Sequence, residues 1–275
     1  MLRLRAGEVA AWAAVRFLGT RNNSRTAVTR ILCIANQKGG VGKTTTAVNL
    51  AVGLAKAGKR TLLVDLDPQC NATTGLGRTP SARHPLVSLA PLAESLCEPG
   101  PPNLELLPGS RSFEDVEALA TSGDEQAATL RQHLAAGLTS YDFVLIDCPP
   151  SLGPLTRTAL ASSTEVFIPI QCEYFAMEGL AQMIEVIRDV MNMQASRLAF
   201  GGIVLTMYDP RLELTAEVDD EVREFFGDIV FRNPIPRDVA VAEAPSHGCS
   251  VLDYAPRSRG ARAYIELCLE VLESD

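Results

Sequence analysis

Short apolar runs alternate with amphipathic stretches along most of the chain. Six runs have the length of a strand, at residues 31–35, 61–66, 104–107, 141–146, 165–170 and 200–206. The segments between them have helical periodicity, at 43–57, 112–121, 124–138, 155–163, 175–193 and 211–226. Strands that alternate with helices predict right-handed crossovers. We therefore expect an α/β fold, with a mostly parallel twisted sheet covered by helices on both faces.

The first 29 residues differ from the rest. Residues 1–30 hold six arginines against the single Glu8, although the whole chain has a net charge of −8. The apolar run at 9–18 is too short to span a membrane. A transit-like peptide, a non-native start, a disordered arm and an amphipathic surface helix all fit this composition. We expect an N-terminal extension over 1–29 and one domain over 30–275.

Composition narrows the class of protein. With 47% hydrophobic residues among 275, the chain has enough apolar material for a sizeable core, which excludes wholesale disorder. The seven dispersed cysteines never form a CxxC pair, so we expect buried, inert thiols in a reducing, cytoplasmic setting. The acidic net charge excludes a surface coated with basic residues for nucleic acid, but it leaves room for a local basic patch.

The strongest chemical signal is a glycine-rich loop between the run at 31–35 and the helix expected at 43–57. Glycines let backbone N–H groups approach an anion, and the start of the following helix adds its positive dipole end. Lys43 is placed to reach the β- and γ-phosphates of a nucleotide, and the Thr44 hydroxyl to bind Mg²⁺. Gly58 is expected to cap the helix. The predicted nucleotide-binding residues are Lys38, Gly39, Gly40, Val41, Gly42, Lys43, Thr44 and Thr45.

The loop departs from the ordinary GxxxxGK[ST] pattern. Gln37 occupies the first glycine position, and a second lysine, Lys38, stands at the head of the loop. A lysine there is poorly placed to serve only its own loop. It could reach a phosphate across a subunit interface if two loops faced each other.

Aspartates follow two of the apolar runs. Asp65 and Asp67 lie at the end of the run at 61–66, and Asp147 follows the run at 141–146. The carboxyl ends of parallel strands share one sheet edge, where ligands bind. Asp147 therefore fits a Mg²⁺ ligand acting through water.

These motifs together resemble the ParA/MinD ATPase superfamily. Residues 38–51 resemble its deviant Walker A motif, 64–69 its Walker A′ or switch I segment, and 144–150 its Walker B and switch II segment. The likeness continues through 171–174, 205–209, 235–238 and 243–246, and it covers about residues 30–272. Within the superfamily the chain is most similar to the ParA/Soj branch, so the fold is expected to be of the P-loop NTPase type.

The resemblance implies an ATP hydrolase with Mg²⁺ that segregates DNA. ATP would close a sandwich homodimer in which Lys38 contacts the partner's nucleotide. Asp67 would orient the attacking water as part of the metal site, and Asp65 would support it. Adenine contacts would come from Met207, Pro236 and Asp238. A ParB/Spo0J-like centromere-binding partner would stimulate hydrolysis.

The ParA/Soj branch binds double-stranded DNA without sequence preference, through arginines that touch phosphates. The candidates here are Arg211, Arg232, Arg237, Arg257, Arg259 and Arg262. Ala240 occupies a place where relatives often carry a basic residue, which should weaken DNA affinity. We expect a cytoplasmic, nucleoid-associated protein.

Three other functions are weighed against this one. A MinD-like membrane-associated positioning ATPase needs a basic amphipathic helix, whereas the acidic residues at 265–275 would be repelled by anionic lipid. No membrane partner is therefore expected. An iron–sulfur carrier could use Cys148 and Cys172. A non-hydrolysing nucleotide switch would not need Lys43, Thr44, Asp67 and Asp147 together.

Overall fold

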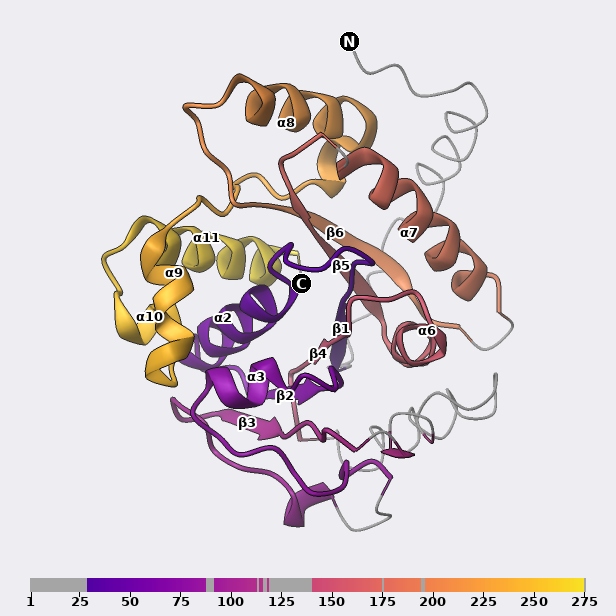
Figure 1. The fold of residues 1–275 in the computed structure, drawn as a ribbon, viewed down its shortest axis with the longest axis vertical. Helices are drawn as coiled ribbons and strands as arrows, with labels where there is room; N and C mark the ends of the chain where they lie inside the picture. The colour runs from indigo at the N-terminus through magenta and orange to yellow at the C-terminus, as the bar shows by residue number, and fades with distance from the viewer. Residues whose placement is uncertain are drawn as a thin grey trace.

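The protein was analysed as a computed structural model, which describes residues 29–87, 92–112, 114, 115, 118, 140–174, 176–193 and 196–274. Its centre is a six-stranded parallel sheet in the order β3-β2-β4-β1-β5-β6 (Figure 1). The strands are β1 (Arg30–Ile34), β2 (Thr61–Asp65), β3 (Leu104–Leu107), β4 (Phe143–Asp147), β5 (Glu165–Gln171) and β6 (Ala199–Thr206).

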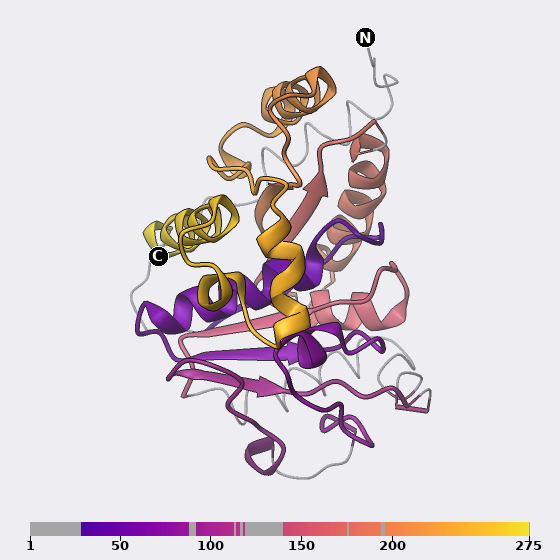
Figure 2. The same cartoon turned by 60° about the vertical axis from the view of Figure 1, so that its left-hand side comes forward.

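Helices cover both faces of the sheet. One face carries α2 (Lys43–Lys56), α10 (Val251–Tyr254) and α11 (Arg259–Glu273), and the other carries α6 (Pro154–Ser162), α7 (Ala176–Met191) and α8 (Glu213–Phe226), as Figures 1 and 2 show. Short helices complete the described chain: α3 (Asn71–Gly75), α9 (Val239–Glu243) and the 3-10 turns Leu92–Glu94, Gly227–Ile229 and Ala244–His247.

The strands are buried on both sides, which explains their nearly continuous apolar runs. Along β1, Leu32 and Ile34 pack under α2 and α11, whereas Cys33 packs under α6 and α7. This alternation follows from the two-residue repeat of a strand. The two apolar layers leave only the ends of the strands available for polar chemistry.

Most of the expected elements are confirmed. All six strands lie within two residues of the predicted runs, and so do the helices expected at 43–57, 155–163, 175–193 and 211–226. Gly58 caps α2 with φ 84° and donates its N–H to Ala55. The helices expected at 112–121 and 124–138 fall largely outside the described residues, as does the extension expected at 1–29.

Several features differ from the sequence-based expectations. No helix was expected at α3, α9, α10 or α11. All seven cysteines are free, as expected, but Cys97 and Cys249 are only partly buried. Among the residues that the structure describes, no helix combines the length and apolar character needed to cross a bilayer.

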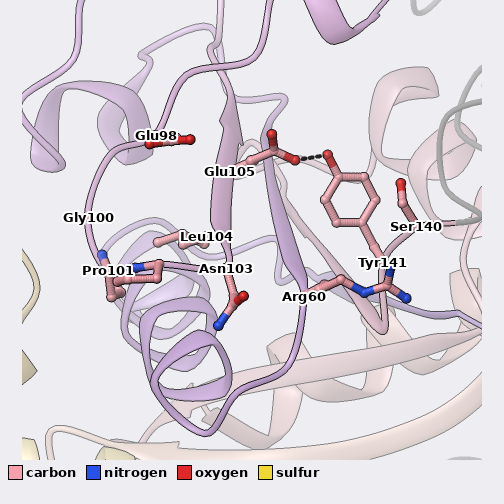
Figure 3. Close-up of a pocket in the computed structure, with 10 residues that line it drawn as sticks. Arg60, Glu98, Gly100, Pro101, Asn103, Leu104, Glu105, Ser140 and Tyr141 are labelled. Atoms are coloured by element: carbon pink, nitrogen blue, oxygen red, sulfur yellow. Dashed lines mark hydrogen bonds between the residues drawn. The ribbon is translucent and has the colours of Figure 1, made fainter.

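A surface groove lies at the amino ends of β2, β3 and β4. It has a volume of about 430 Å³ and is lined by Arg60, Asn103 and Tyr141 among others. In Figure 3 the Tyr141 hydroxyl points to Glu105 and donates a hydrogen bond to it. The groove is at the opposite edge of the sheet from the ends that carry the aspartates, so it is separate from the site described below.

The contact between α2 and α11 gives a stability test. A Cβ added at Gly53 would lie 2.2 Å from the Cys268 sulfur. Gly53→Ala should therefore lower the free energy of unfolding by about 1–3 kcal/mol through overpacking, although alanine is the better helix former by ~1 kcal/mol. Thermal denaturation measures the change, and Cys268→Ala in the same chain should restore much of the loss.

Gly179→Ala in α7 is the matched control, because a Cβ there meets no atom within 4 Å. Equal melting temperatures for the two alanine variants would contradict the close approach of α2 and α11.

Candidate functional site

The glycine loop between β1 and α2 has the backbone shape of an anion-binding turn. Gly40 has φ 76° and Gly42 has φ 87°, values that residues with a Cβ rarely adopt. Gly42 is the N-cap of α2, and the first turn of that helix contains no acidic side chain. The helix therefore presents its free N–H groups and positive dipole end to the loop, as phosphate-binding loops do.

Lys43 points its side chain back across the same loop. Its ammonium donates to the carbonyl of Lys38 at 2.9 Å, and the residue is only 6% exposed. Desolvation lowers the pKa of Lys43, and the negative charges of Asp147 and Asp67 partly counter that effect. A buried cation in a loop of backbone N–H groups is suited to bind phosphate oxygens.

Asp65 and Asp147 end adjacent strands, β2 and β4, and they are register partners. Both are fully buried. Asp65 is well satisfied, because Thr73 donates to its Oδ2 through both the backbone N–H (2.8 Å) and the hydroxyl (2.6 Å). Burial nevertheless raises the pKa of Asp65 to about 6.

Asp147 has no such support. Burial, and then the charge of Asp65, raise the pKa of Asp147 well above its usual value, and the neighbouring Thr44 hydroxyl counters this only in part. Neither carboxylate oxygen of Asp147 has a hydrogen-bond partner of normal geometry in the described chain. A buried carboxylate without partners is costly unless something neutralises it.

The residues around Asp147 fit a magnesium ion. Mg²⁺ prefers carboxylate and hydroxyl oxygens and keeps several of its waters. The Asp147 carboxylate supplies two unpartnered oxygens, and Thr44 supplies a hydroxyl beside them. Asp67, 5% exposed, lies near enough to Lys43 to act on its pKa, and its Oδ1 accepts the N–H of Gln69 at 2.9 Å.

Two further polar residues build the walls of the loop, and sequence analysis did not assign roles to them. The Asn36 side chain donates to the Pro169 carbonyl at 2.7 Å and accepts the Lys38 N–H at 3.0 Å. The Thr206 hydroxyl lies 2.9 Å from the Val41 carbonyl. Both follow or end buried strands, so the signal that selected the aspartates would also have found them.

Lys38, the extra lysine of the loop, forms an ion pair with Glu173 just after β5. Its side chain is about one-third exposed. In this single chain the ammonium therefore rests beside the loop. The predicted contact across a subunit interface stays a prediction.

The three candidate adenine contacts lie around the end of β6. Met207 has φ 52°, and its neighbour Tyr208 forms a parallel bridge with Pro236. Both carboxylate oxygens of Asp238 are engaged within the chain, by the N–H groups of Ala240 (3.0 Å) and Gly260 (2.8 Å). The Asp238 side chain thus caps α9, and the adenine contact stays a prediction.

The six candidate arginines fall into two groups. Arg211 makes a bidentate pair with Asp209, and Arg232 pairs with Glu270 and Glu273. Within the described part of the chain, the other four have no ion pair and are exposed: Arg237, Arg257, Arg259 and Arg262. The structure therefore favours these four for contacts with an anionic partner.

Comparisons with known proteins agree with this geometry. Residues 29–200 match the family described as an AAA domain. The chromosome-partitioning ATPase Soj of Treponema pallidum (strain Nichols) is 44% identical over 248 residues, 90% of this chain and 98% of the relative. The chromosome partitioning protein ParA of Caulobacter vibrioides (strain NA1000 / CB15N) is 44% identical over 253 residues, 90% of this chain and 95% of the relative.

A solved structure gives the same picture of the fold. The septum site-determining protein MinD from Pyrococcus horikoshii OT3, complexed with Mg-ADP, has a TM-score of 0.74 and 28% identity. The match covers 89% of this chain and 96% of that one. A P-loop NTPase-type sheet was expected from the sequence, and this comparison confirms it.

The lack of hydrogen-bond partners for the Asp147 carboxylate leads to a testable prediction about stability. Asp147→Asn should raise the melting temperature of the nucleotide-free protein by several degrees, because it removes a buried charge without partners; about 1 kcal/mol corresponds to roughly 2–4 °C for a chain of this size. Since the pKa of Asp147 is raised in the fold, the aspartate form loses stability as the pH rises above about 4, and the gain should grow with pH.

Thermal denaturation with and without Mg-ATP provides the measurement. The variant should gain less from Mg-ATP than the parent protein does. Asp189→Asn, which changes a carboxylate about 60% exposed, is the control and should alter neither value. A lower melting temperature for nucleotide-free Asp147→Asn would refute this account.

Proposed function

Because the chain belongs to the ParA/Soj family of chromosome-partitioning ATPases, we propose that ATP turns it into a dimer that binds DNA without sequence preference. The protein is a partition ATPase that hydrolyses ATP with Mg²⁺. A ParB/Spo0J-like partner that marks the centromere stimulates hydrolysis and thereby releases the DNA. The observation that carries this proposal is the meeting of Lys43, Asp147 and Asp67 at one sheet edge.

Each residue of this edge has a distinct task in phosphoryl transfer. The N–H groups of the loop and the Lys43 ammonium hold the β- and γ-phosphates. Thr44 and Asp147 hold Mg²⁺, which neutralises charge on the phosphate oxygens when bound. Asp67 orients the water that attacks the γ-phosphate. Little covalent chemistry is required of the protein, so positioning and charge decide the rate.

Lys38 couples the nucleotide to dimerisation. Its ammonium is surface-accessible and held by the single carboxylate of Glu173. An exposed ion pair of this kind contributes about 1 kcal/mol or less, so a phosphate of a second subunit can replace Glu173 as its partner at little cost. The dimer then depends on ATP because the γ-phosphate supplies the competing charge.

Lys38→Ala should leave ATP binding to the single chain within about threefold of the parent protein and abolish the ATP-dependent dimer. The Lys38 ammonium is paired with Glu173, whereas the Lys43 ammonium already lies across the loop. Sedimentation velocity with ATP and with ADP measures the dimer. Lys59→Ala, at the other end of α2, is the control. A dimer of normal stability in Lys38→Ala would show that this lysine does not join the subunits.

The DNA-binding surface centres on the start of α11. Arg257 and Arg259 flank its N-cap, Ser258, and Arg262 follows one turn later. The Asp238 carboxylate accepts the Gly260 N–H at this helix start, but it is one anion beside three cations at the positive end of a helix dipole, an arrangement that favours a further anion. DNA phosphates satisfy this arrangement, and contacts to phosphate carry no sequence information.

Arginine variants test this surface. Arg259→Ala and Arg262→Ala should each weaken ATP-dependent binding to a random-sequence duplex, and each should reduce the salt slope by about 0.9 for one lost phosphate contact. Fluorescence anisotropy at two salt concentrations, with ATP, ADP or no nucleotide, gives both quantities. Arg232→Ala is the matched control, since two glutamates already neutralise that arginine. If Arg232→Ala lost DNA affinity while Arg259→Ala and Arg262→Ala kept theirs, the proposed DNA-binding surface would be refuted.

The structure gives no support to the MinD-like membrane function. The C-terminal helix α11 buries Tyr264, Leu267 and Val271 in the core against α2. Its outward side mixes Ile265 and Leu269 with Glu266 and Glu273. A helix that uses its main apolar face for the core, and presents acids outside, is poorly suited to anionic lipid.

A further inference from the structure

The segment that carries Asp67 is closed by a single buried contact. It leaves the sheet at Asp65, at the end of β2, and enters α3 at residue 71. Thr73 in α3 returns to Asp65 with two hydrogen bonds to the same oxygen, Oδ2. Both residues are fully buried. The contact therefore clamps the two ends of residues 66–72 together.

The Thr73 hydroxyl is held on its other side as well. The N–H of Gly109, which follows β3, donates to the Thr73 oxygen at 2.9 Å. A Cβ on Gly109 would lie 3.0 Å from the Asp65 carboxyl carbon, so this segment packs directly on the clamp. Because the hydroxyl accepts from Gly109 and donates to Asp65, its hydrogen has one orientation. Thr73 thus joins β2, α3 and the segment after β3.

The clamp reaches Asp67 through the second oxygen of Asp65. The backbone N–H of Asp67 donates to Asp65 Oδ1 at 3.2 Å, while Oδ2 is held by Thr73. Cys70 then turns the chain with φ 56°, and its N–H donates to the Asp67 carbonyl at 2.8 Å. The position of Asp67 is therefore set on one side by the Asp65 carboxylate and on the other by the turn at Cys70.

We propose that Thr73 is a positioning residue for ATP hydrolysis: its hydroxyl fixes the Asp65 carboxylate, which in turn fixes the backbone of Asp67. The inference rests on the role proposed above for Asp67. Thr73 itself touches neither nucleotide nor metal. It acts on the turnover rate and leaves ATP binding to Lys43 and the glycine loop.

The chain offers variants that separate this role from simple support of the fold. Thr73→Val keeps the shape and the backbone N–H bond to Asp65 but removes the hydroxyl. Thr73→Ser restores the hydroxyl. Thr61→Val is the matched control, because Thr61 begins the same strand, is equally buried and uses its hydroxyl to bind the Lys59 carbonyl at 3.0 Å. Asp67→Ala, measured in parallel, tests the premise.

Hydrolysis by the full chain is measured as kcat and KM for Mg-ATP, together with the melting temperature. Thr73→Val should lower kcat by about 10- to 100-fold, the range expected when a reacting group is misplaced by up to about 1 Å, with KM within about twofold. Thr73→Ser should recover kcat to within about threefold of the parent protein. Thr61→Val should lose stability without a comparable loss of kcat, and Asp67→Ala should be inactive.

The outcomes distinguish the inference from its premise. Turnover at the parent rate in Thr73→Val, with Asp67→Ala inactive, overturns the role of Thr73 alone. Turnover at the parent rate in Asp67→Ala overturns the role proposed for Asp67. An equal loss of kcat in Thr61→Val reduces Thr73 to a structural residue. If Thr73→Val does not fold, Thr73→Cys takes its place, because a thiol is a weak donor; kcat at the parent rate in that variant also overturns the inference.

Discussion

The parallel register of β2 and β4 is the constraint from which the rest of the site follows. It places Asp65 beside Asp147 at the end of two fully buried strands. Burial raises the pKa of both carboxylates, and the charge of Asp65 raises the pKa of Asp147 further. The fold surrounds the two carboxylates differently. Asp65 receives the donors of Thr73, and Asp147 is left open beside the Lys43 ammonium. Asp65 is thereby held rigidly, whereas Asp147 remains available to bind a ligand.

The fold could be predicted from the sequence because its physical signals are local. A parallel sheet buried on both faces requires continuous apolar strands, so each strand is visible as a run. The missed helices have weaker signals. Helix α3 has five residues, and its N-cap is Cys70, a residue type that does not predict the left-handed conformation found there. Helix α11 begins among arginines, which give no apolar signal for its start.

The site was predictable only in part for the same reason. Lys43 and Asp147 follow apolar strands or a glycine loop, so motif and edge together place them. Thr73 gains its role from its contact to Asp65, which lies eight residues away along the chain in another element. Sequence periodicity holds no information on such pairs. The same limit applies to the candidate arginines, because the sequence does not show which of them has a carboxylate beside it in the fold.

The distinction between arginines that pair with carboxylates and arginines that do not bears on how an acidic protein could bind DNA. The net charge of −8 would repel a polyanion at long range. Arg211 pairs with Asp209, and Arg232 pairs with Glu270 and Glu273, so carboxylates already neutralise both arginines. The start of α11 differs, because its own first turn carries no acid and three arginines surround the single carboxylate of Asp238 that contacts it. A local patch of this kind binds weakly alone. In the ATP-dependent dimer proposed above, two copies would place twice the positive charge along one duplex and so would supply affinity that a single chain lacks.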